Sequence, residues 1–170
     1  MSGYRRDIGE AHPRLPLSES GGEDAPDVFL DWLAEAIPMV RSLGIQQMQR
    51  DGDQLIWQLA LTPNLNDKGT GFGGALTAQT TLLGWCWTTL WLRRRGILRD
   101  VVVATATQRF RAPVTDDYRM ICMPAEANAS ERLAEQLDQK GRGRISLVQQ
   151  LWCGDTLCLE ASGDYVVLAQ

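Results

Sequence analysis

Asn66-Asp67-Lys68-Gly69-Thr70-Gly71-Phe72-Gly73-Gly74 is the stretch that decides the fold, together with the long apolar segment from Ala75 to Arg95 that follows it. Glycine has no Cβ, so a segment this rich in glycine lets backbone N–H groups approach a ligand closely. A helix that begins directly behind it adds unpaired N–H groups and a partial positive charge. The stretch therefore predicts a binding site for an oxygen that carries negative charge.

One interpretation of these glycines is a dinucleotide-binding loop, because Gly69-x-Gly71-x-x-Gly74 matches the pattern G-x-G-x-x-G. That fold requires a strand directly before the loop. The nearest strand pattern, Gln54 to Thr62, is separated from Gly69 by six residues and reads as half of a hairpin. The strand pattern from Val101 to Ala112 also lacks an acidic residue at its end to bind a ribose. Both observations disfavour a dinucleotide-binding fold.

A second interpretation takes the stretch as Asn66-x-x-Gly69-x-x-Phe72-Gly73-Gly74. It resembles the N-x-x-G-x-x-H-G-G signature of hotdog-fold acyl-CoA thioesterases, with Phe72 where many members carry histidine. Together with Gly84-Trp85 and Lys140-Gly141-Arg142-Gly143-Arg144, the chain resembles the thioesterase family typified by the C-terminal domain of bacterial YiiD. The resemblance covers about Trp32 to Leu168. It implies an α+β hotdog fold, an antiparallel β-sheet around one long central helix.

The remaining elements suit this fold. Asp27 is expected to cap a short amphipathic helix that ends at Pro38, and a surface helix is expected at 130–140. Strict alternation from Val101 would place Val103 and Thr105 on one face of their strand. We expect the strand at 118–125 to pair with it. Strands are expected at 43–49, 54–62, 101–112, 118–125, 145–152 and 156–168.

Composition favours one compact domain. The chain has 170 residues, of which 44% are hydrophobic and 22% charged. Residues 1–26 are rich in glycine, serine, proline and charge, and we expect them to lack fixed structure, with one domain at 27–170. The net charge of −4 argues against nucleic acid as a partner. No secretory signal is visible, so the cytoplasm is the expected compartment.

The long helix is not expected to span a membrane. Threonine and glutamine side chains, from Thr77 to Thr89, interrupt an apolar stretch that would need roughly 20 residues to cross a bilayer. A helix that is apolar on nearly all sides is instead buried by other parts of the protein.

The single histidine, His12, lies in the N-terminal tail. A Ser-His-Asp triad, a Cys-His pair, a histidine-bound zinc and a hotdog dehydratase would each need a histidine in the folded part. We therefore expect neither a metal nor a cofactor.

The chemistry follows from the loop and the resemblance. A backbone N–H at Gly73 or Gly74 would stabilise the negative charge that develops on a thioester oxygen during hydrolysis. By resemblance, Asn66 orients the attacking water or binds the thioester; the alternative is an Asn that only holds the loop through an Asx-turn. Related enzymes carry a catalytic carboxylate at the position of Thr81, and threonine cannot act as a general base near neutral pH. Asp67 is a candidate substitute from the loop.

The resemblance implies acyl-CoA or acyl-carrier-protein thioesters as substrates, in fatty acid metabolism. The alternative is a non-catalytic module that binds acyl thioesters or dimerises. Subunits of this fold are expected to pair through edge strands as a homodimer or a dimer of dimers. Candidate substrate-binding residues are Phe72 and Gly74 in the loop, Thr105 on a strand, and Lys68, Arg142 and Arg144 for the phosphates of the carrier.

Overall fold

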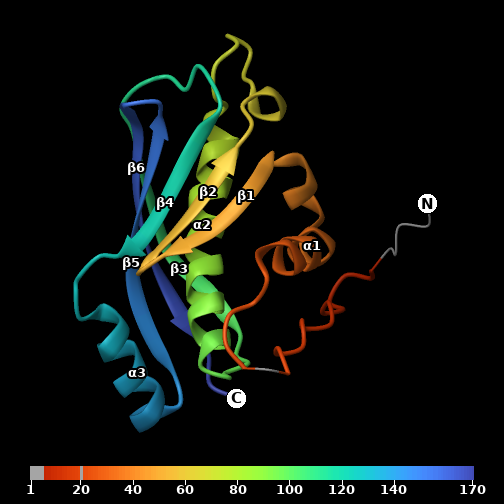
Figure 1. The fold of residues 1–170 in the computed structure, drawn as a ribbon, viewed down its shortest axis with the longest axis vertical. Helices are drawn as coiled ribbons and strands as arrows, with labels where there is room; N and C mark the ends of the chain where they lie inside the picture. The colour runs from red at the N-terminus through yellow and green to blue at the C-terminus, as the bar shows by residue number, and fades with distance from the viewer. Residues whose placement is uncertain (1–5, 20) are drawn as a thin grey trace.

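Six antiparallel strands and one long helix form the body of the protein in the computed structural model, which describes residues 6–19 and 21–170 (Figure 1). The sheet has the order β1-β2-β4-β5-β6-β3, and α2 (Gly73–Arg94) runs along its inner face. The strands are β1 (Ile45–Asp51), β2 (Gln54–Leu59), β3 (Val101–Phe110), β4 (Tyr118–Pro124), β5 (Gly143–Cys153) and β6 (Thr156–Val167). A curled antiparallel sheet around one helix is the expected hotdog fold, which is confirmed.

One expected strand pairing is wrong. β4 pairs with β2 and β5, whereas β3 pairs with β6 alone and lies at the edge of the sheet. The reason is the path of α2, which carries the chain from β2 across the inner face to the opposite edge. β3 therefore begins far from β2, and the connection after β3 returns the chain to the middle of the sheet, where β4 joins β2.

The inner face of the sheet carries continuous cross-strand rows of apolar side chains. One row crosses all six strands through successive pairs of directly opposed residues. Its members are Met48, Trp57, Met120, Leu151, Leu159 and Phe110. All are buried except Phe110, at the β3 edge, which is 53% exposed. The apolar core is thus shielded from solvent on the β1 side and partly exposed to solvent at the β3 edge.

The central helix is buried on most sides because it is apolar around most of its circumference. It begins at Gly73, two residues earlier than expected, and ends at Arg94. Gly84 lets Tyr165 of β6 pack against the helix, since a Cβ at Gly84 would lie 2.1 Å from the tyrosine ring. The Tyr165 hydroxyl then donates to the carbonyl oxygen of Thr81 at 2.9 Å. Within the described residues, no helix combines the length and apolarity that a membrane span requires.

Two further helices lie outside the sheet. α1 (Pro26–Ala36) packs through Phe29 and Leu33, and α3 (Ala129–Lys140) lies beside β5 and ends at Gly141. The expected cap at Asp27 is wrong: Pro26 is the first helical residue, so Asp27 lies in the first turn and Ala25 takes the cap position. Proline suits this place because its φ is already helical and it has no N–H to satisfy. Short 3₁₀ helices cover Pro38–Ser42 and Thr62–Asn64.

The N-terminal segment 6–19 lies against the helices. Trp32 Nε1 donates to the carbonyl oxygen of Pro13 at 2.9 Å, and the buried Arg93 side chain donates to the carbonyl oxygens of Leu15 and Pro16 at 2.7 and 2.8 Å. Residues 1–5 and 20 of the expected tail lie outside the described residues, and the domain boundary at 26/27 stays a prediction.

Candidate active site

The glycine loop lies at the N-terminal end of α2, at the top of Figure 1. Both sides of the loop are fixed to the body by backbone hydrogen bonds. Phe72 N donates to Asn64 O at 2.7 Å, and Gly71 N donates to Val114 O at 2.9 Å. A Cβ on Gly71 would lie 2.9 Å from the Val114 side chain, so only glycine fits there without a shift. The backbone around the helix start is therefore held in one place.

Asn66 uses its whole side-chain amide inside the loop. Its Oδ1 accepts hydrogen bonds from the amides of Lys68 and Thr70, at 2.9 and 3.0 Å. Its Nδ2 donates to Thr70 Oγ1 at 2.9 Å and to Gly71 O at 3.3 Å. These four bonds saturate the donors and acceptors of an asparagine amide. Of the two roles left open by the sequence, the structure displays the loop-holding Asx-turn.

The amides of Gly73 and Gly74 lie at the open end of the helix. The first backbone bond of the helix runs from Leu76 N to Phe72 O, so the amides before it have no acceptor in the helix. Among the described residues, no group accepts a hydrogen bond from either glycine amide. Gly73 is half-buried and Gly74 is exposed. Two donors and the positive end of the helix dipole therefore face solvent together.

Two phenyl rings flank these glycines. A Cβ built on Gly74 would lie 2.6 Å from the Phe72 ring, and a Cβ on Gly73 would lie 3.6 Å from the Phe110 ring. Each phenylalanine is 53% exposed. Phe72 was expected at the site, whereas Phe110 was missed. Its signal in the sequence is an aromatic residue three positions before Pro113, at the end of the edge strand.

Asp67 and Lys68 lie at the exposed tip of the loop. Lys68 Nζ contacts the Asp67 carboxylate at 2.9 Å, and the two side chains are 75% and 79% exposed. Such a pair is screened by water and contributes little to stability. Both groups are free to turn toward a bound ligand.

Thr81 lies about 12 Å along α2 from Gly73, from the rise of the helix. It belongs to a half-buried stripe on α2 with Thr77, Trp85 and Thr89. α2 itself carries no aspartate or glutamate, and at the Thr89 end of the stripe the Asp100 carboxylate lines the same cavity as Trp85 and Thr89. In the described part of the chain, no three or more histidine, cysteine, aspartate or glutamate side chains gather in a way that could hold a metal ion.

A buried polar network supports the loop from the core side, and no sequence motif predicts it. The Tyr118 hydroxyl donates to Gln79 Oε1 at 2.8 Å, and Gln79 Nε2 donates to Leu43 O at 3.0 Å. Asn64 Nδ2 donates to the same carbonyl at 2.8 Å. Burial raises the pKa of Tyr118 to about 12, so its proton stays in place as a donor. Because the Asn64 carbonyl binds Phe72 N, this network fixes where α2 begins. A glutamine inside an apolar helix was the available signal.

Thr105 lies away from the loop, on the outer face of the sheet. A β-bulge between Val103 and Thr105 shifts the register, so Thr105 is directly opposite the outward-facing Asp164. The expected strict alternation is therefore wrong beyond Val103. Hydrogen bonds from Ser146, Arg144 and Thr105 hold the pKa of the Asp164 carboxyl at about 2. Thr105 thus belongs to a surface network rather than to the start of α2.

Arg142 and Arg144 lie at the opposite end of the molecule from the glycine loop. Arg144 is in the cross-strand row of Val166 and Val102, whereas Phe110 marks the loop end of β3. Eight residues of strand separate these two positions, which is roughly 26 Å. Arg144 also donates to Asp164 at 2.7 Å. Within one chain, these arginines and the loop do not form one site.

Solved structures support the fold and the family. A protein of unknown function from Chlorobaculum tepidum is 26% identical, with a TM-score of 0.76 over 85% of this chain and 97% of that one. A putative thioesterase from Shewanella oneidensis is 26% identical, with a TM-score of 0.73 over 84% and 96%. A probable thioesterase from Pseudomonas aeruginosa, at 21% identity, has a TM-score of 0.68 over 88% and 100%, and shows the fold alone.

The family model described as "Putative thioesterase (yiiD_Cterm)" matches residues 28–169, nearly the whole folded part of the chain. The family is one of thioester hydrolases, and the saturated loop and the open helix start described above lie within the matched residues. The chain belongs to the YiiD C-terminal thioesterase family.

Proposed function

We propose that this enzyme hydrolyses acyl thioesters of coenzyme A or of an acyl-carrier protein, and that it does so at the glycine loop. The observation that carries the proposal is the pair of unbonded amides at Gly73 and Gly74, flanked by two exposed phenyl rings. The rings offer an apolar surface for an acyl chain. We place this substrate class in cytoplasmic fatty acid metabolism as part of the same proposal.

Thioester hydrolysis is accelerated by groups that stabilise the negative charge developing on the carbonyl oxygen. Water attacks the carbonyl carbon, a C–O bond forms and the carbonyl oxygen becomes negative. The C–S bond then breaks, and a carboxylic acid and the carrier thiol leave. Amide donors aimed at this oxygen stabilise the transition state, and the loss of one such donor costs about 100- to 1000-fold in rate. The Gly73 and Gly74 amides, at the positive end of α2, are placed for this role.

The attacking water has no general base on α2, because Thr81 occupies that position. General bases contribute about 100- to 10,000-fold, so we propose slow hydrolysis that depends on electrostatic stabilisation. The candidate for a substitute base is Asp67, whose exposed carboxylate can turn toward the helix start. Asn66 acts by holding the loop and so positions the two amides.

A second copy of the chain would complete this site. β3 is an edge strand that pairs only with β6, and it has exposed apolar side chains at Val102, Val103 and Phe110; long apolar edges invite pairing. The half-buried stripe of α2 at Thr77 and Thr81 is also incompletely covered. We propose a homodimer or a dimer of dimers joined through β3. Lys68 would meet the phosphates of the carrier, and Arg142 and Arg144 would reach them only from the partner.

The second candidate function is an acyl-thioester-binding or dimerisation module without turnover. The observation that favours it is the missing carboxylate at Thr81. A Thr81→Asp variant separates the two: a rate increase would indicate a working site that lacks only its base. Burial could instead keep the new carboxyl protonated, in which case the rate stays at the parent level.

The experiment that tests hydrolysis is thiol release from a panel of acyl-CoA thioesters of graded chain length, followed with a thiol reagent. A mock purification from cells without the expression plasmid provides the background from contaminating thioesterases, and Gly73→Val, purified in the same way as the parent, tests the loop. We expect turnover by the parent protein on at least one thioester and none above background by the variant. Binding of the same thioesters without thiol release would support the non-catalytic module, and equal rates for both proteins would place the site elsewhere.

A further inference from the structure

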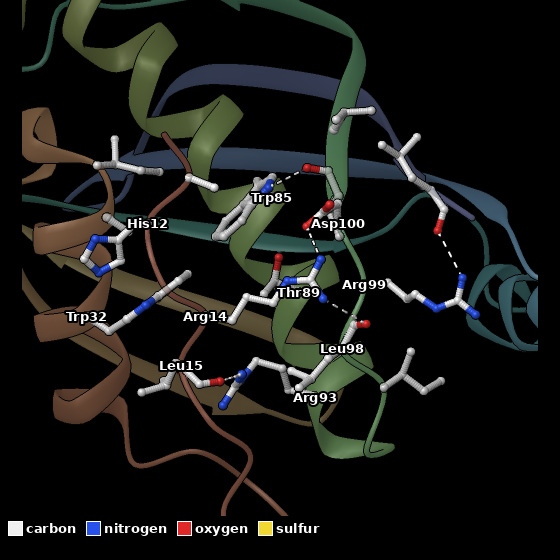
Figure 2. A pocket seen from close by; sticks show the side chains of 17 residues that line it. His12, Arg14, Leu15, Trp32, Trp85, Thr89, Arg93, Leu98, Arg99 and Asp100 are labelled. Atoms are coloured by element: carbon white, nitrogen blue, oxygen red, sulfur yellow. Dashed lines mark hydrogen bonds and ion pairs between the residues drawn. The ribbon is translucent and has the colours of Figure 1, made fainter. Parts of the chain in front are cut away.

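A cavity lies at the other end of α2, and nothing in the proposed reaction uses it. Its volume is about 490 Å³, within the range of small-molecule sites. The N-terminal segment, α1, the C-terminal half of α2 and the loop before β3 enclose it (Figure 2). Thr89, which lines it, is roughly 24 Å along α2 from Gly73.

The wall formed by the N-terminal segment is fixed. Arg14 forms an ion pair with Asp100 at 2.7 Å, across the cavity mouth. The bond from Trp32 to the Pro13 carbonyl and those from Arg93 to the carbonyls of Leu15 and Pro16 hold the segment on either side. These bonds hold the N-terminal segment in place as one wall of the cavity.

Most of the lining is apolar and aromatic. The indole rings of Trp32 and Trp85 lie 6.4 Å apart at an interplanar angle of 16°. Both indole N–H groups already donate to backbone carbonyls, so the rings offer only their apolar surfaces. Aliphatic side chains complete this lining, at Leu15, Ile37, Ile97 and Val101. Such a surface suits a hydrocarbon chain.

Two polar groups, the Thr89 hydroxyl and the Arg14 guanidinium, border the cavity. Figure 2 shows the Thr89 side chain and the Arg14 guanidinium below the Trp85 indole. The Thr89 hydroxyl is buried and has no hydrogen-bond partner among the described residues. The two bonds of Arg14, to Asp100 and to Leu98 O, use two of its five N–H donors. A buried hydroxyl without a partner is costly, and because the Thr89 hydroxyl has almost no accessible surface, a ligand oxygen would satisfy it after the side chain rotates toward the cavity.

The charges around the cavity leave a positive excess. Asp24 neutralises Arg93, with both side chains over 90% buried, and Asp100 neutralises Arg14. Arg99 donates only to backbone carbonyls, at Gly141 and Leu168. Among the described residues Arg99 thus has no carboxylate partner, and its positive charge favours an anionic ligand in the cavity through its field, without a direct contact. A single small anion with an apolar tail fits both the charge and the lining.

We propose that this cavity binds an aliphatic monocarboxylate, with its carboxylate between Arg14 and Thr89 and its chain on Trp32 and Trp85. The carboxylate accepts from the guanidinium and from the threonine hydroxyl, and it shares Arg14 with the exposed Asp100. This binding site is separate from the glycine loop and does not depend on the proposed hydrolysis.

Calorimetric titration with octanoate tests the proposal, with 1-octanol and octyltrimethylammonium as neutral and cationic probes of equal chain length. We expect octanoate to bind with a Kd of about 100 μM and to raise Tm, because a ligand that binds only the folded state stabilises it. Octanol should bind at least about tenfold more weakly, since its oxygen accepts from Arg14 without a negative charge, and the cation should not bind, since it has no acceptor and is repelled by Arg14. Equal affinity for octanol would overturn the carboxylate assignment.

Single substitutions of residues around the cavity test whether octanoate binds there. Arg14→Gln and Thr89→Val should each weaken octanoate binding about tenfold, as expected for one lost hydrogen bond. Asp100→Asn should tighten it, because the negative charge that competes for Arg14 is removed. Ala36→Phe should abolish binding by filling the cavity. Thr80→Val is the matched control, because the Thr80 hydroxyl donates to Thr77 O in the same helix outside the cavity.

The proposal fails if octanoate does not bind the parent protein at 1 mM, a concentration about tenfold above the expected Kd. It also fails if Ala36→Phe, folded by circular dichroism, binds as the parent does. The opposite signs expected for Arg14→Gln and Asp100→Asn separate a direct contact from a general loss of stability, which would weaken binding in both.

Discussion

The two ends of α2 differ in whether the protein itself supplies hydrogen-bond partners for the backbone groups there. At the C-terminal end, Ile97 N and Gly96 N donate to the carbonyl oxygens of Leu92 and Arg93 at 3.1 and 2.9 Å, and the N-terminal segment covers the last turn. At the N-terminal end, the amides of Gly73 and Gly74 have no acceptor in the described protein.

From this difference we expect substitutions at the two ends of α2 to affect different properties of the protein. The C-terminal end is satisfied by the chain itself, so changes there should cost folding free energy. The N-terminal end keeps donors for a ligand, so changes there should cost activity. The loop side chains do not compensate for those donors: Asn66 is saturated within the loop, and the buried Gln79 network only fixes where the helix begins.

The largest expected effect is on folding, at Arg93. Its side chain is 5% exposed and makes two bonds to Asp24 and two to backbone carbonyls. Arg93→Met leaves Asp24 buried without a partner, so we expect a loss of about 3–5 kcal/mol in the free energy of unfolding, measured with urea. Arg94→Met, which removes a more exposed arginine one residue later, is the control. A loss below about 1 kcal/mol for Arg93→Met would contradict the account.

The next effect is on catalysis, at Gly73. A Cβ at this position meets only Phe110, at the ordinary contact distance of 3.6 Å, so Gly73→Val should fold. The new side chain would cover the amide, and we expect kcat/KM to fall by about 100-fold or more. Ala134→Val in α3 is the matched control for a β-branched residue in a helix. Parent-like turnover by a folded Gly73→Val protein would separate the glycine amides from catalysis.

A smaller effect is expected at Asn66. Asn66→Ala removes four loop hydrogen bonds and lets the two amides move, so kcat/KM should fall by roughly 10- to 100-fold. Asp67→Ala removes only an exposed partner of Lys68 and should cost less. A larger loss for Asp67→Ala, together with the loss of an acid limb in the pH–rate profile, would identify Asp67 as the base. An Asn66→Ala enzyme as fast as the parent would refute the positioning role.

The smallest effect concerns Asp164 of β6, on the outer face of the sheet. The folded-state pKa of Asp164, at about 2, is below the ordinary value of 3.8, so its bonds stabilise the fold above pH 4 and are lost as the pH falls toward 2. Because Asp164 is partly solvated, we expect only about 1 kcal/mol. Urea titrations of the parent and Asp164→Asn should differ by this amount at pH 6 and converge near pH 2. A constant difference would contradict the assignment.

The sequence was sufficient for the parts of the fold that depend on local patterns. The glycine stretch and the apolar segment after it located the central helix, and turn residues such as Gly52 and Gly141 located strand and helix ends. The position of β3 beside β6 was not predictable in this way, because it depends on the path of α2 across the sheet.

The sequence predicted only the part of the candidate site that is formed by backbone amides. The motif identified Gly73 and Gly74, whereas the placement of Thr105 depended on a β-bulge that leaves no mark in a run of alternating residues. Phe110 and Gln79 reach the loop through tertiary packing, so no spacing rule could bring them to it. The positive charges of Arg142 and Arg144 are typical of phosphate sites. Within one chain, however, both residues lie at the end of the molecule opposite the glycine loop.

The central claim is that a thioester binds at the open N-terminal end of α2, and amide NMR tests it most directly. Titration with a non-hydrolysable acyl-CoA analogue should move the amide proton resonance of Gly73 or Gly74 downfield, as a new hydrogen bond forms to the analogue's carbonyl oxygen. Resonances of the distant cavity, such as those of Thr89 and Leu98, should change little. Unchanged glycine amides under saturating analogue, with shifts confined to the cavity, would contradict the account.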